Sequence, residues 1–522
     1  MSLKLGLSNE ADTKKKEKYM STDTLIEVLP AEPSELDPKR YWSLAIIAIA
    51  QLMIVLDASV VVVALPSAQH ALHISIANRQ WVLGAYTLAF GSLLLLGGRI
   101  ADYLGRRRMF IVGLLGFGVA SALGGVAQNQ AMLFSARALQ GAFAAIMAPA
   151  ALSLLTVTFT ESRERARAFG VYGAVAGGGA AIGLVLGGVL TQFASWRWTL
   201  LINVPIALFA AIMARQVITE SRAEAKHGYD MPGAVTATGG LFLLVYGFTM
   251  VASHGWSSTL TVSLFAGALA LLGAFIAIEL RSQHPLLPMR VVLDRRRGGS
   301  LLASLLVGCA MLGTFLFLTY FLQGILGYSA LKTGFAFLPF SGGIILGATT
   351  ASRILPRSGP RALMLTGLSM ATLGLLWFSR LGVHSTFAAH ILLPEIVVSI
   401  GMGLVFVPMN STSLYGVDPQ DAGVASALVN TTQQVGGALG TAFLNTVAAS
   451  VTATYLATRI GSLSMQRAAA VHGYTTAFEV SALLVALSAA AVAAFIGPKR
   501  RHVEVLKDHS LNSTSRHFIS IN

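Results

Sequence analysis

Charged residues are scarce in this chain of 522 residues. They make up 11% of it, whereas hydrophobic residues make up 54%; soluble domains carry about 25% charged residues. This composition excludes a soluble globular protein and indicates a polytopic membrane protein. The net charge of +14 would suit nucleic acid, but the basic residues lie mainly in short loops between apolar runs. We therefore expect a lipid bilayer, and no nucleic acid, as a partner.

Three further absences narrow the function. A single cysteine, Cys309, leaves no internal disulfide. No Gly-Lys pair occurs, which excludes the phosphate-binding loop of an ATP-driven pump within this chain. The eleven histidines are scattered, and the longest polar segments are the tails. We therefore expect no metal site, no cofactor and no enzyme activity, with a membrane receptor or enzyme as a remote alternative.

Apolar runs bounded by turn and charge signals predict fourteen membrane-spanning helices, since about 20 apolar residues cross the hydrocarbon of a bilayer. The helices are expected near residues 42–66, 79–98, 109–127, 132–156, 166–190, 198–216, 231–251, 258–280, 299–322, 334–351, 361–380, 386–412, 422–448 and 475–496. The predicted fold class is an all-α membrane protein, and an even number of helices puts both termini on one side.

Basic residues decide which side this is, because short cytoplasmic loops carry Lys and Arg in excess. Alternate loops hold most of them: Arg99, Arg106, Arg107, Arg108, Arg163, Arg165, Arg167, Arg215, Arg222, Lys226, Arg281, Arg290, Arg295, Arg296, Arg297, Arg353, Arg357 and Arg361. The opposite loops hold fewer: Arg79, Arg197, Lys332, Arg380, Arg459 and Arg467. The sequence predicts a multi-pass protein of the plasma (inner) membrane with both termini in the cytoplasm.

Two loops share a pattern at a constant offset. Residues 99–107 read Arg-Ile-Ala-Asp-Tyr-Leu-Gly-Arg-Arg and residues 353–361 read Arg-Ile-Leu-Pro-Arg-Ser-Gly-Pro-Arg, so that Arg, Ile, Gly and Arg recur. Because both loops are predicted on the cytoplasmic side, they indicate two parallel six-helix halves. The helices near 231–251 and 258–280 are then an insert, which gives six plus two plus six.

The expected divisions are a disordered cytoplasmic tail (1–40), a six-helix half (41–220), a two-helix insert with its flanking loops (221–298), a second six-helix half (299–497) and a cytoplasmic tail (498–522).

The first apolar run holds a single acid, Asp57. An acid in mid-membrane costs about 2.5 to 3.5 kcal/mol on insertion scales, so it indicates a function and requires a partner. Helical rise places Asp57 roughly 13 Å below the outer end of its helix and Arg137 roughly 9 Å below the same face. A carboxyl group whose solvation alternates can load and release a proton. We predict that Asp57 and Arg137 pair and form a proton-binding site.

The stretch that begins at Gly98 resembles the signature loop between helices two and three of the major facilitator superfamily. Gly98 and Gly105 allow close backbone approach, and Asp102 and Arg106 are four residues apart and can pair on a helix. The resemblance implies the major facilitator fold and a cytoplasmic gate, formed by these four residues, that latches the two halves when the protein opens outward. Pro356 replaces the acid in the second copy, so only the first half is expected to carry a strong latch.

Two further stretches resemble motifs of this superfamily. Arg137, Gln140 and Gly141 match its R-x-x-Q-G motif. In the fifth predicted helix, small residues at intervals of about four form a smooth packing face; they are Gly179, Gly183, Gly187 and Gly188. This helix resembles the antiporter motif, although Leu184 stands where the motif has proline. We expect the packing role but not a proline-dependent bend.

Residues 56–66 resemble the first-helix motif of the fourteen-helix drug:proton antiporter family, with Ser59 for the usual Thr and Val62 for the usual Asn. The most specific match is Ser-Trp-Arg-Trp at 195–198 followed by Ile-Asn-Val-Pro at 202–205. Residues 430–437 resemble the family's helix-thirteen pattern, with Gln433 for the usual Arg. The resemblance covers about residues 40 to 500.

The resemblance implies a proton-coupled secondary active exporter, an antiporter of amphipathic small molecules such as drugs or antibiotics, that works by alternating access. The expected substrate cavity is lined by Gln140, Tyr320, Gln323, Glu395 and Gln433. Glu395 either faces Asp57 across this cavity, which would favour cationic substrates, or faces solvent or a neighbouring helix. A dedicated exporter of one metabolite, siderophore or amino acid is the alternative function. We expect a monomer, with a periplasmic adaptor as a further partner in a bacterium with two membranes.

Overall fold

The computed structural model describes residues 39–222, 230–282, 285–287, 289–413, 422–457 and 462–497. Most of the two predicted tails, residues 1–38 and 498–522, therefore lies outside the described residues. The elements of the first half, which we take as residues 40–222, are α2 (Arg40–Ala71), α3 (Trp81–Leu104), α4 (Arg106–Gly125), α5 (Gln130–Thr158), α6 (Ser162–Phe193), α7 (Trp198–Leu201) and α8 (Asn203–Val217).

Two helices, α9 (Met231–His254) and α10 (Thr259–Arg281), follow the first half. The elements of the second half, residues 289–497, are α11 (Met289–Val292), α12 (Arg295–Tyr320), the π-helix η1 (Phe321–Ile325), α13 (Ala330–Ala336), α14 (Leu338–Phe378), the π-helix η2 (Phe387–Ile391), α15 (Leu392–Ser413), α16 (Ala422–Ala457) and α17 (Leu463–Phe495). All regular structure in the described residues is helical, as the composition predicts.

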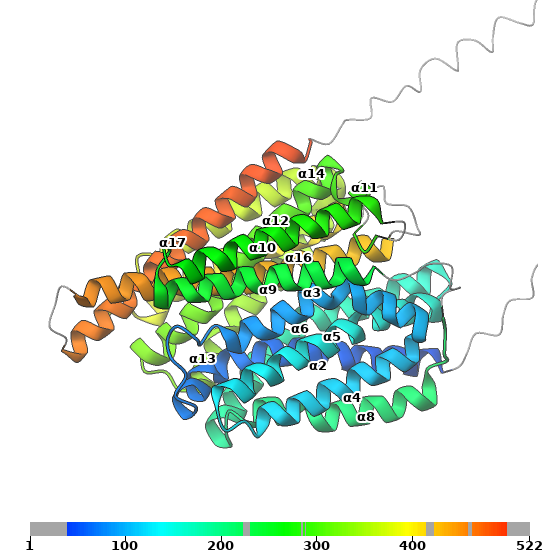
Figure 1. Cartoon of the computed structure of the whole chain (residues 1–522), viewed down its shortest axis with the longest axis horizontal. Helices are drawn as coiled ribbons and strands as arrows, with labels where there is room; N and C mark the ends of the chain where they lie inside the picture. Colours follow the sequence, from blue (N-terminus) through cyan, green and yellow to red (C-terminus); the bar gives the residue numbers. More distant parts are fainter. Residues whose placement is uncertain are drawn as a thin grey trace, which may run out of the picture.

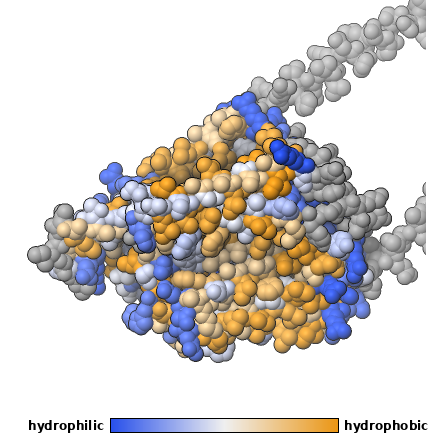
Figure 2. Space-filling model, viewed as in Figure 1, coloured by the Kyte–Doolittle hydropathy of each residue, from blue (hydrophilic) through white to orange (hydrophobic). Residues whose placement is uncertain are grey.

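The helices run roughly side by side as one bundle (Figure 1). Its surface carries an apolar band between two polar ends (Figure 2), the arrangement that a bilayer requires. The start of α2 at Arg40 and the end of α17 at Phe495 lie at the same end of the bundle, which we call the terminal end. The opposite end, where α2 ends at Ala71 and α12 ends at Tyr320, is called the distal end.

Eleven of the described helices are long and apolar enough to cross a membrane, and the bent helix α3 makes a twelfth. The difference from fourteen arises at two places. In α6 only Gly179–Phe193 is found as an apolar run, and α14 is counted as one helix of 41 residues although a non-helical kink at Gly359 lies between the two helices that the sequence predicts. The number fourteen therefore stays a prediction.

The two loops with the shared sequence pattern also share a backbone break. Gly105, between α3 and α4, has a φ of 111°, and Gly359, inside α14, has a φ of 75°. Side chains make such positive φ values unfavourable, whereas glycine adopts them readily. The glycine of each copy therefore lets the chain turn at the same point of the repeat.

The pair α9 and α10 packs at the junction of the two halves. Helix α9 contacts α10, α3 of the first half and α16 of the second half, and the pair runs between the two halves in Figure 1. Elsewhere, α3 contacts α16 directly and α6 contacts α13. This packing supports the six-plus-two-plus-six division, which remains a prediction.

Some helices extend beyond the predicted spans because polar caps, rather than hydropathy, set their ends. Helix α17 begins at Leu463, where the Ser462 side chain accepts a hydrogen bond from the backbone N–H of Met465. The prediction that Arg467 lies in a loop is therefore wrong, since this residue belongs to the first turns of α17.

Candidate functional site

Asp57 lies at the centre of a buried polar network. Its side chain is 1% exposed, and Nη1 of Arg137, which is 0% exposed, donates to its Oδ2 at 2.5 Å. Its Oδ1 accepts hydrogen bonds from Nε2 of Gln140 and Nδ2 of Asn203, both at 2.9 Å. A buried charge is tolerated when it is paired and its remaining lone pairs are satisfied. Three donors from two helices meet this condition for Asp57.

Arg137 is held on several sides. Its Nε donates to the backbone carbonyl of Val82 at 3.0 Å, and Nη1 also donates to Oε1 of Gln140 at 2.9 Å. Its guanidinium carbon lies 4.5 Å from the ring centroid of Tyr86, in cation–π range. Nη2 has no hydrogen-bond partner among the described residues, and Arg137 lines a small cavity together with Trp196. One guanidinium nitrogen is thus left for a further acceptor.

Helix geometry assembles this network. Arg137 and Gln140 are three residues apart on α5, so their side chains leave the same face. Asn203 is the first residue of α8, immediately after the break that separates α7 from α8. Nε2 of Gln140 also donates to the hydroxyl of Ser121 on α4 at 2.7 Å. The Asp57 network therefore joins α2, α3, α4, α5 and α8 of the first half.

At the distal end, residues of the two halves bond to each other. The hydroxyl of Tyr320, the last residue of α12, donates to Oε1 of Gln69 in α2. Nε2 of Gln323 in η1 donates to the backbone carbonyl of Val63 at 2.9 Å. In this conformation Tyr320 and Gln323 hold α12 and η1 against α2; their place in a substrate cavity stays a prediction.

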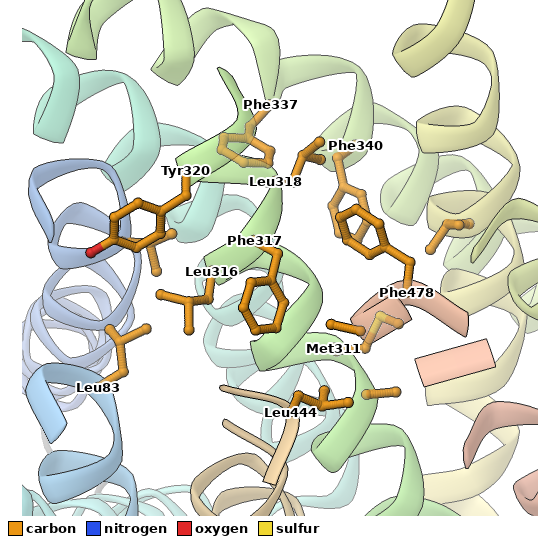
Figure 3. Packing of buried hydrophobic residues seen from close by; sticks show 14 of the residues in the cluster. Leu83, Met311, Leu316, Phe317, Leu318, Tyr320, Phe337, Phe340, Leu444 and Phe478 are labelled. Atoms are coloured by element: carbon orange, nitrogen blue, oxygen red, sulfur yellow. The ribbon is translucent and has the colours of Figure 1, made fainter. Parts of the chain in front are cut away.

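Arg79 extends from the first half into an aromatic group of the second. Its side chain is 3% exposed, and its guanidinium carbon lies 4.1 Å from the ring centroid of Tyr320. The rings of Phe317 and Tyr474 each lie 5.8 Å away. Figure 3 shows Tyr320 pointing away from Phe317 and toward the helices of the first half. These aromatic rings hold a buried cation that belongs to the other half.

Asn445 of α16 completes the contact. Its Oδ1 accepts from Nε of Arg79 at 2.9 Å, and its Nδ2 donates to Oε1 of Gln80 at 2.7 Å and to the carbonyl of Ile76 at 3.0 Å. Gln80 also donates to Thr249 of α9 at 3.2 Å. We call the contacts of Arg79, Gln80, Asn445, Tyr320, Gln69 and Gln323 the distal seal.

At the terminal end, Nε of Arg106 donates to Oδ1 of Asp102 at 2.8 Å, the i, i+4 pair that the sequence predicts. Asp102 is more than one third exposed, so this ion pair is worth only about 0.2 to 1 kcal/mol. Gly98 faces Pro149 of α5, where an added Cβ would lie 3.4 Å from the proline ring. The structure joins Asp102 and Arg106 within one half; their role as a latch between the halves stays a prediction.

The same loop is anchored by Glu220, which the sequence did not reveal. Its two carboxylate oxygens accept from the backbone N–H groups of Arg107 and Arg108 at 3.0 and 3.1 Å, at the start of α4. A Cβ at Gly105 would lie 2.9 Å from the same carboxylate. An acid is favourable at this helix end because it meets free N–H groups and the positive end of the dipole.

The small residues of α6 face two different helices. Three of them pack on α2: Gly179, Gly183 and Gly187. Gly188 faces α13 of the second half, where an added Cβ would lie 2.7 Å from Cα of Leu331. The close packing of α6 against α2 and against α13 therefore depends on glycine.

The other predicted cavity residues lie apart from each other. Gln140 belongs to the Asp57 network, whereas Gln433 is half-buried on α16, with its backbone carbonyl against Gly308. Glu395 is 0% exposed inside the second half. A common cavity for these side chains stays a prediction.

The site residues that the sequence did not predict include Arg79, Asn203, Glu220 and Asn445. Asn445 interrupts the apolar run 422–448, and a polar residue there is itself a signal of an interhelical hydrogen bond. Asn203 lies in the string 202–205, which matches the family motif but does not by itself indicate a contact with Asp57. Arg79 and Glu220 lie near helix ends, where charge is ordinary and gives no such signal.

Comparison with known proteins agrees with this architecture. The puromycin resistance protein pur8 of Streptomyces alboniger is 49% identical over 454 residues, which cover 86% of this chain and 90% of that protein. The cephamycin export protein CmcT of Amycolatopsis lactamdurans is 42% identical over 414 residues, 78% of this chain and 85% of that protein.

Solved structures show the same fold. The crystal structure of a bacterial homolog of the human lysosomal transporter Spinster, in an inward-facing and unoccupied conformation, has a TM-score of 0.61 at 16% identity. It covers 88% of this chain, and the match covers 98% of that chain. The sequence profile of the Major Facilitator Superfamily matches residues 47–441. The chain therefore belongs to the Major Facilitator Superfamily.

Proposed function

We propose that this protein is a proton-coupled exporter of an amphipathic, antibiotic-like small molecule and that it works by alternating access as a monomer. The names of its relatives, a puromycin resistance protein and a cephamycin export protein, support the substrate class. The excess of Lys and Arg in the loops of the terminal end supports a cytoplasmic location for that end. The distal end then faces outward from the plasma membrane, and the distal seal closes the outer side.

The Asp57 network is the observation that carries proton coupling. Arg137, Gln140 and Asn203 all donate to a carboxylate that is almost fully buried. A proton on Asp57 would remove the charge attraction to Arg137 and would leave α2 and α5 freer to move against each other. Proton uptake at Asp57 and rearrangement of the first half are thus linked through one ion pair.

The test is transport into reconstituted proteoliposomes under an imposed proton gradient, with labelled puromycin and ethidium as probes. Asp57→Asn keeps the size of the side chain and removes its charge, so we expect it to abolish gradient-driven uptake. Glu164→Gln is the matched control, because Glu164 pairs with Arg40 at 2.8 Å outside the network. Full gradient-driven transport by Asp57→Asn would exclude Asp57 as the proton carrier.

The breadth of substrates separates the two export functions. A broad exporter would transport both puromycin and ethidium, whereas a dedicated exporter would transport one compound and ignore the rest of a panel of cationic and neutral molecules. Export of a single compound would support the dedicated alternative without affecting the proton mechanism.

We further propose that Asp102 and Arg106 gate the cytoplasmic side. Their pair at 2.8 Å fixes the loop before α4, which would meet the second half when the outer side opens. Asp102→Lys should reduce transport, because it places two positive charges four residues apart. Unchanged transport by this variant would remove the gating role.

A further inference from the structure

Glu395 is a buried acid that differs from Asp57 in its surroundings. It lies in the first turn of α15 and is 0% exposed, and neither carboxylate oxygen has a hydrogen-bond partner of standard geometry among the described residues. A charged carboxylate without a partner is very costly in an apolar interior, so a group in this position is expected to be neutral.

The internal repeat relates the position of Glu395 to the neighbourhood of the Asp57 network. At the offset that relates Arg99 to Arg353, Glu395 corresponds to Gly141, next to Gln140 of the Asp57 network. At the same offset, Ile391 stands where the first half has Arg137. The second half thus has an acid at the position that corresponds to Gly141, and no arginine at the position that corresponds to Arg137.

In the part of the chain that the structure describes, the elements packed against α15 carry their charged residues away from Glu395. Helix α16 contains no Asp, Glu, Lys or Arg, and His390 of η2 is exposed, with its Nδ1 accepting from the N–H of Thr386. The charged residues of α12 and α14 lie toward the terminal end: Arg295, Arg296, Arg297, Arg353, Arg357 and Arg361. Arg353 is thirteen positions along α14 from Phe340, roughly 20 Å by helical rise. The other titratable groups are Cys309 and Tyr320 of α12 and Tyr455 of α16.

One backbone group does approach the carboxyl. Helix α14 begins at Leu338, and the backbone N–H of Phe340 in its first turn lies next to the carboxyl group of Glu395. The first N–H groups of a helix have no partner within the helix. This amide could support a carboxylate once water also reaches it.

Aromatic contacts join this place to α12, the helix that ends at Tyr320 in the distal seal. The ring of Phe340 packs edge-on against Phe315 of α12, with centroids 4.7 Å apart, and Phe315 also contacts Phe337 at 5.6 Å. Tyr320, which belongs to the seal, lies five residues further along α12. Figure 3 shows Phe337 and Phe340 close to this end of α12. Movement of α12 away from α2 would therefore disturb the packing that covers Glu395.

We propose that Glu395 is a second proton-binding site, loaded from the extracellular side, and that its protonation is required for the distal seal to close. The proposal rests on the proposed alternating access. Opening of the seal hydrates Glu395 and lets its proton exchange with the external medium; closing buries the carboxyl and requires the neutral form. External protons thereby favour return to the outward-closed conformation, which is the direction that proton-driven export needs.

The linkage between proton binding and closing of the distal seal gives the expected size of the pH effect. If one proton is taken up on closing, the ratio of closed to open molecules changes by up to about tenfold per pH unit, and it rises as the pH falls. In the absence of such a site, the ratio should not follow this dependence.

The experiment measures the distance between spin labels across the distal end as a function of pH. The labels are placed at Gln128→Cys and His384→Cys, two exposed loop positions of opposite halves, in a Cys309→Ser background. No substrate is added, so the result does not depend on what the protein exports. We expect the closed population to fall as the pH rises in the parent protein, Glu395→Asp and the control Glu479→Gln, whose acid is exposed. We expect Glu395→Gln to stay closed over the same range.

A pH-dependent shift that persists in Glu395→Gln would overturn the proposal, and so would a parent protein without any shift. Asp57→Asn separates the two hypotheses: it should lose gradient-driven transport but keep the shift of the distal end. Should Glu395→Gln fail to fold, infrared difference spectra of the parent protein decide the question. A carboxylic acid band that disappears when the distal end opens supports the proposal, and the absence of this band contradicts it.

Discussion

Arg79 and Asn445 join the two halves of the bundle, with Nε of the arginine 2.9 Å from Oδ1 of the asparagine across 366 positions of sequence. The same guanidinium lies 4.1 Å from the ring centroid of Tyr320. The partners of Arg79 are uncharged polar and aromatic side chains. When the arginine moves away from them, no buried carboxylate is left without its cation. This contact can therefore break and form repeatedly during a transport cycle.

Arg79→Ala should open the distal seal. The loss of a desolvated cation–π contact is worth about 2 kcal/mol, which corresponds to a roughly thirtyfold change in the ratio of open to closed molecules. The measurement is the labelling rate of Val63→Cys, in a Cys309→Ser background, by a membrane-impermeant maleimide. Val63 is fully buried beneath η1 when the seal is closed.

Arg197→Ala is the matched control for this experiment. Arg197 also lies at the distal end, 4.5 Å over the ring of Trp196, and donates to the carbonyl of Ala127 at 2.7 Å, but all three residues belong to the first half. Its removal should leave the labelling of Val63→Cys unchanged. Equal effects of the two arginine substitutions would show that the distal end responds to any loss of packing.

The buried pair should show strong non-additivity. Arg137→Gln leaves the Asp57 carboxylate buried without its cation, and breaking a buried pair in this way costs about 3 to 5 kcal/mol. The double variant Asp57→Asn/Arg137→Gln buries no charge, so it should melt at a higher temperature than Arg137→Gln alone. Melting in detergent, followed by intrinsic fluorescence, checks this order. The reverse order would mean that Asp57 is neutral in the folded protein.

The Asp57–Arg137 pair could be predicted because the cost of a charge in a membrane applies to both residues. Asp57 and Arg137 are costly in a membrane, and the constant rise of a helix gives each a depth. The shared glycine pattern likewise led from sequence to the breaks at Gly105 and Gly359. Each prediction depended only on local sequence and on the bilayer.

The distal seal could not be predicted in this way. Arg79 is an ordinary charge near a helix end, and its importance depends on Asn445 and Tyr320, which come from distant helices. The number of spans depends on Gly359 as well, where a kink inside α14 separates two helices. Contacts between segments far apart in the chain were beyond what local patterns indicate.

Gly105→Ala should destabilise the protein. A side chain at a φ of 111° is strained by roughly 1 to 2 kcal/mol, and its Cβ would also lie 2.9 Å from the Glu220 carboxylate. Gly84→Ala is the control, because this residue lies inside α3 with no atom within 4 Å of an added Cβ. Alanine there should stabilise the helix by up to about 1 kcal/mol. Thermal melting should therefore shift in opposite directions for the two variants, and a neutral Gly105→Ala would mean that the turn tolerates a different backbone conformation.

Glu220→Gln should weaken the start of α4. The carboxylate accepts from the N–H groups of Arg107 and Arg108, and loss of such a cap costs about 0.5 to 2 kcal/mol. Glu161→Gln is the matched control, because Glu161 precedes α6 but makes no capping hydrogen bond. Amide hydrogen exchange of residues 106–110 should accelerate in Glu220→Gln and stay unchanged in Glu161→Gln. Because the same segment follows the Asp102–Arg106 pair, faster exchange together with reduced transport would connect the anchor to the cytoplasmic gate, whereas faster exchange with normal transport would limit Glu220 to a structural role.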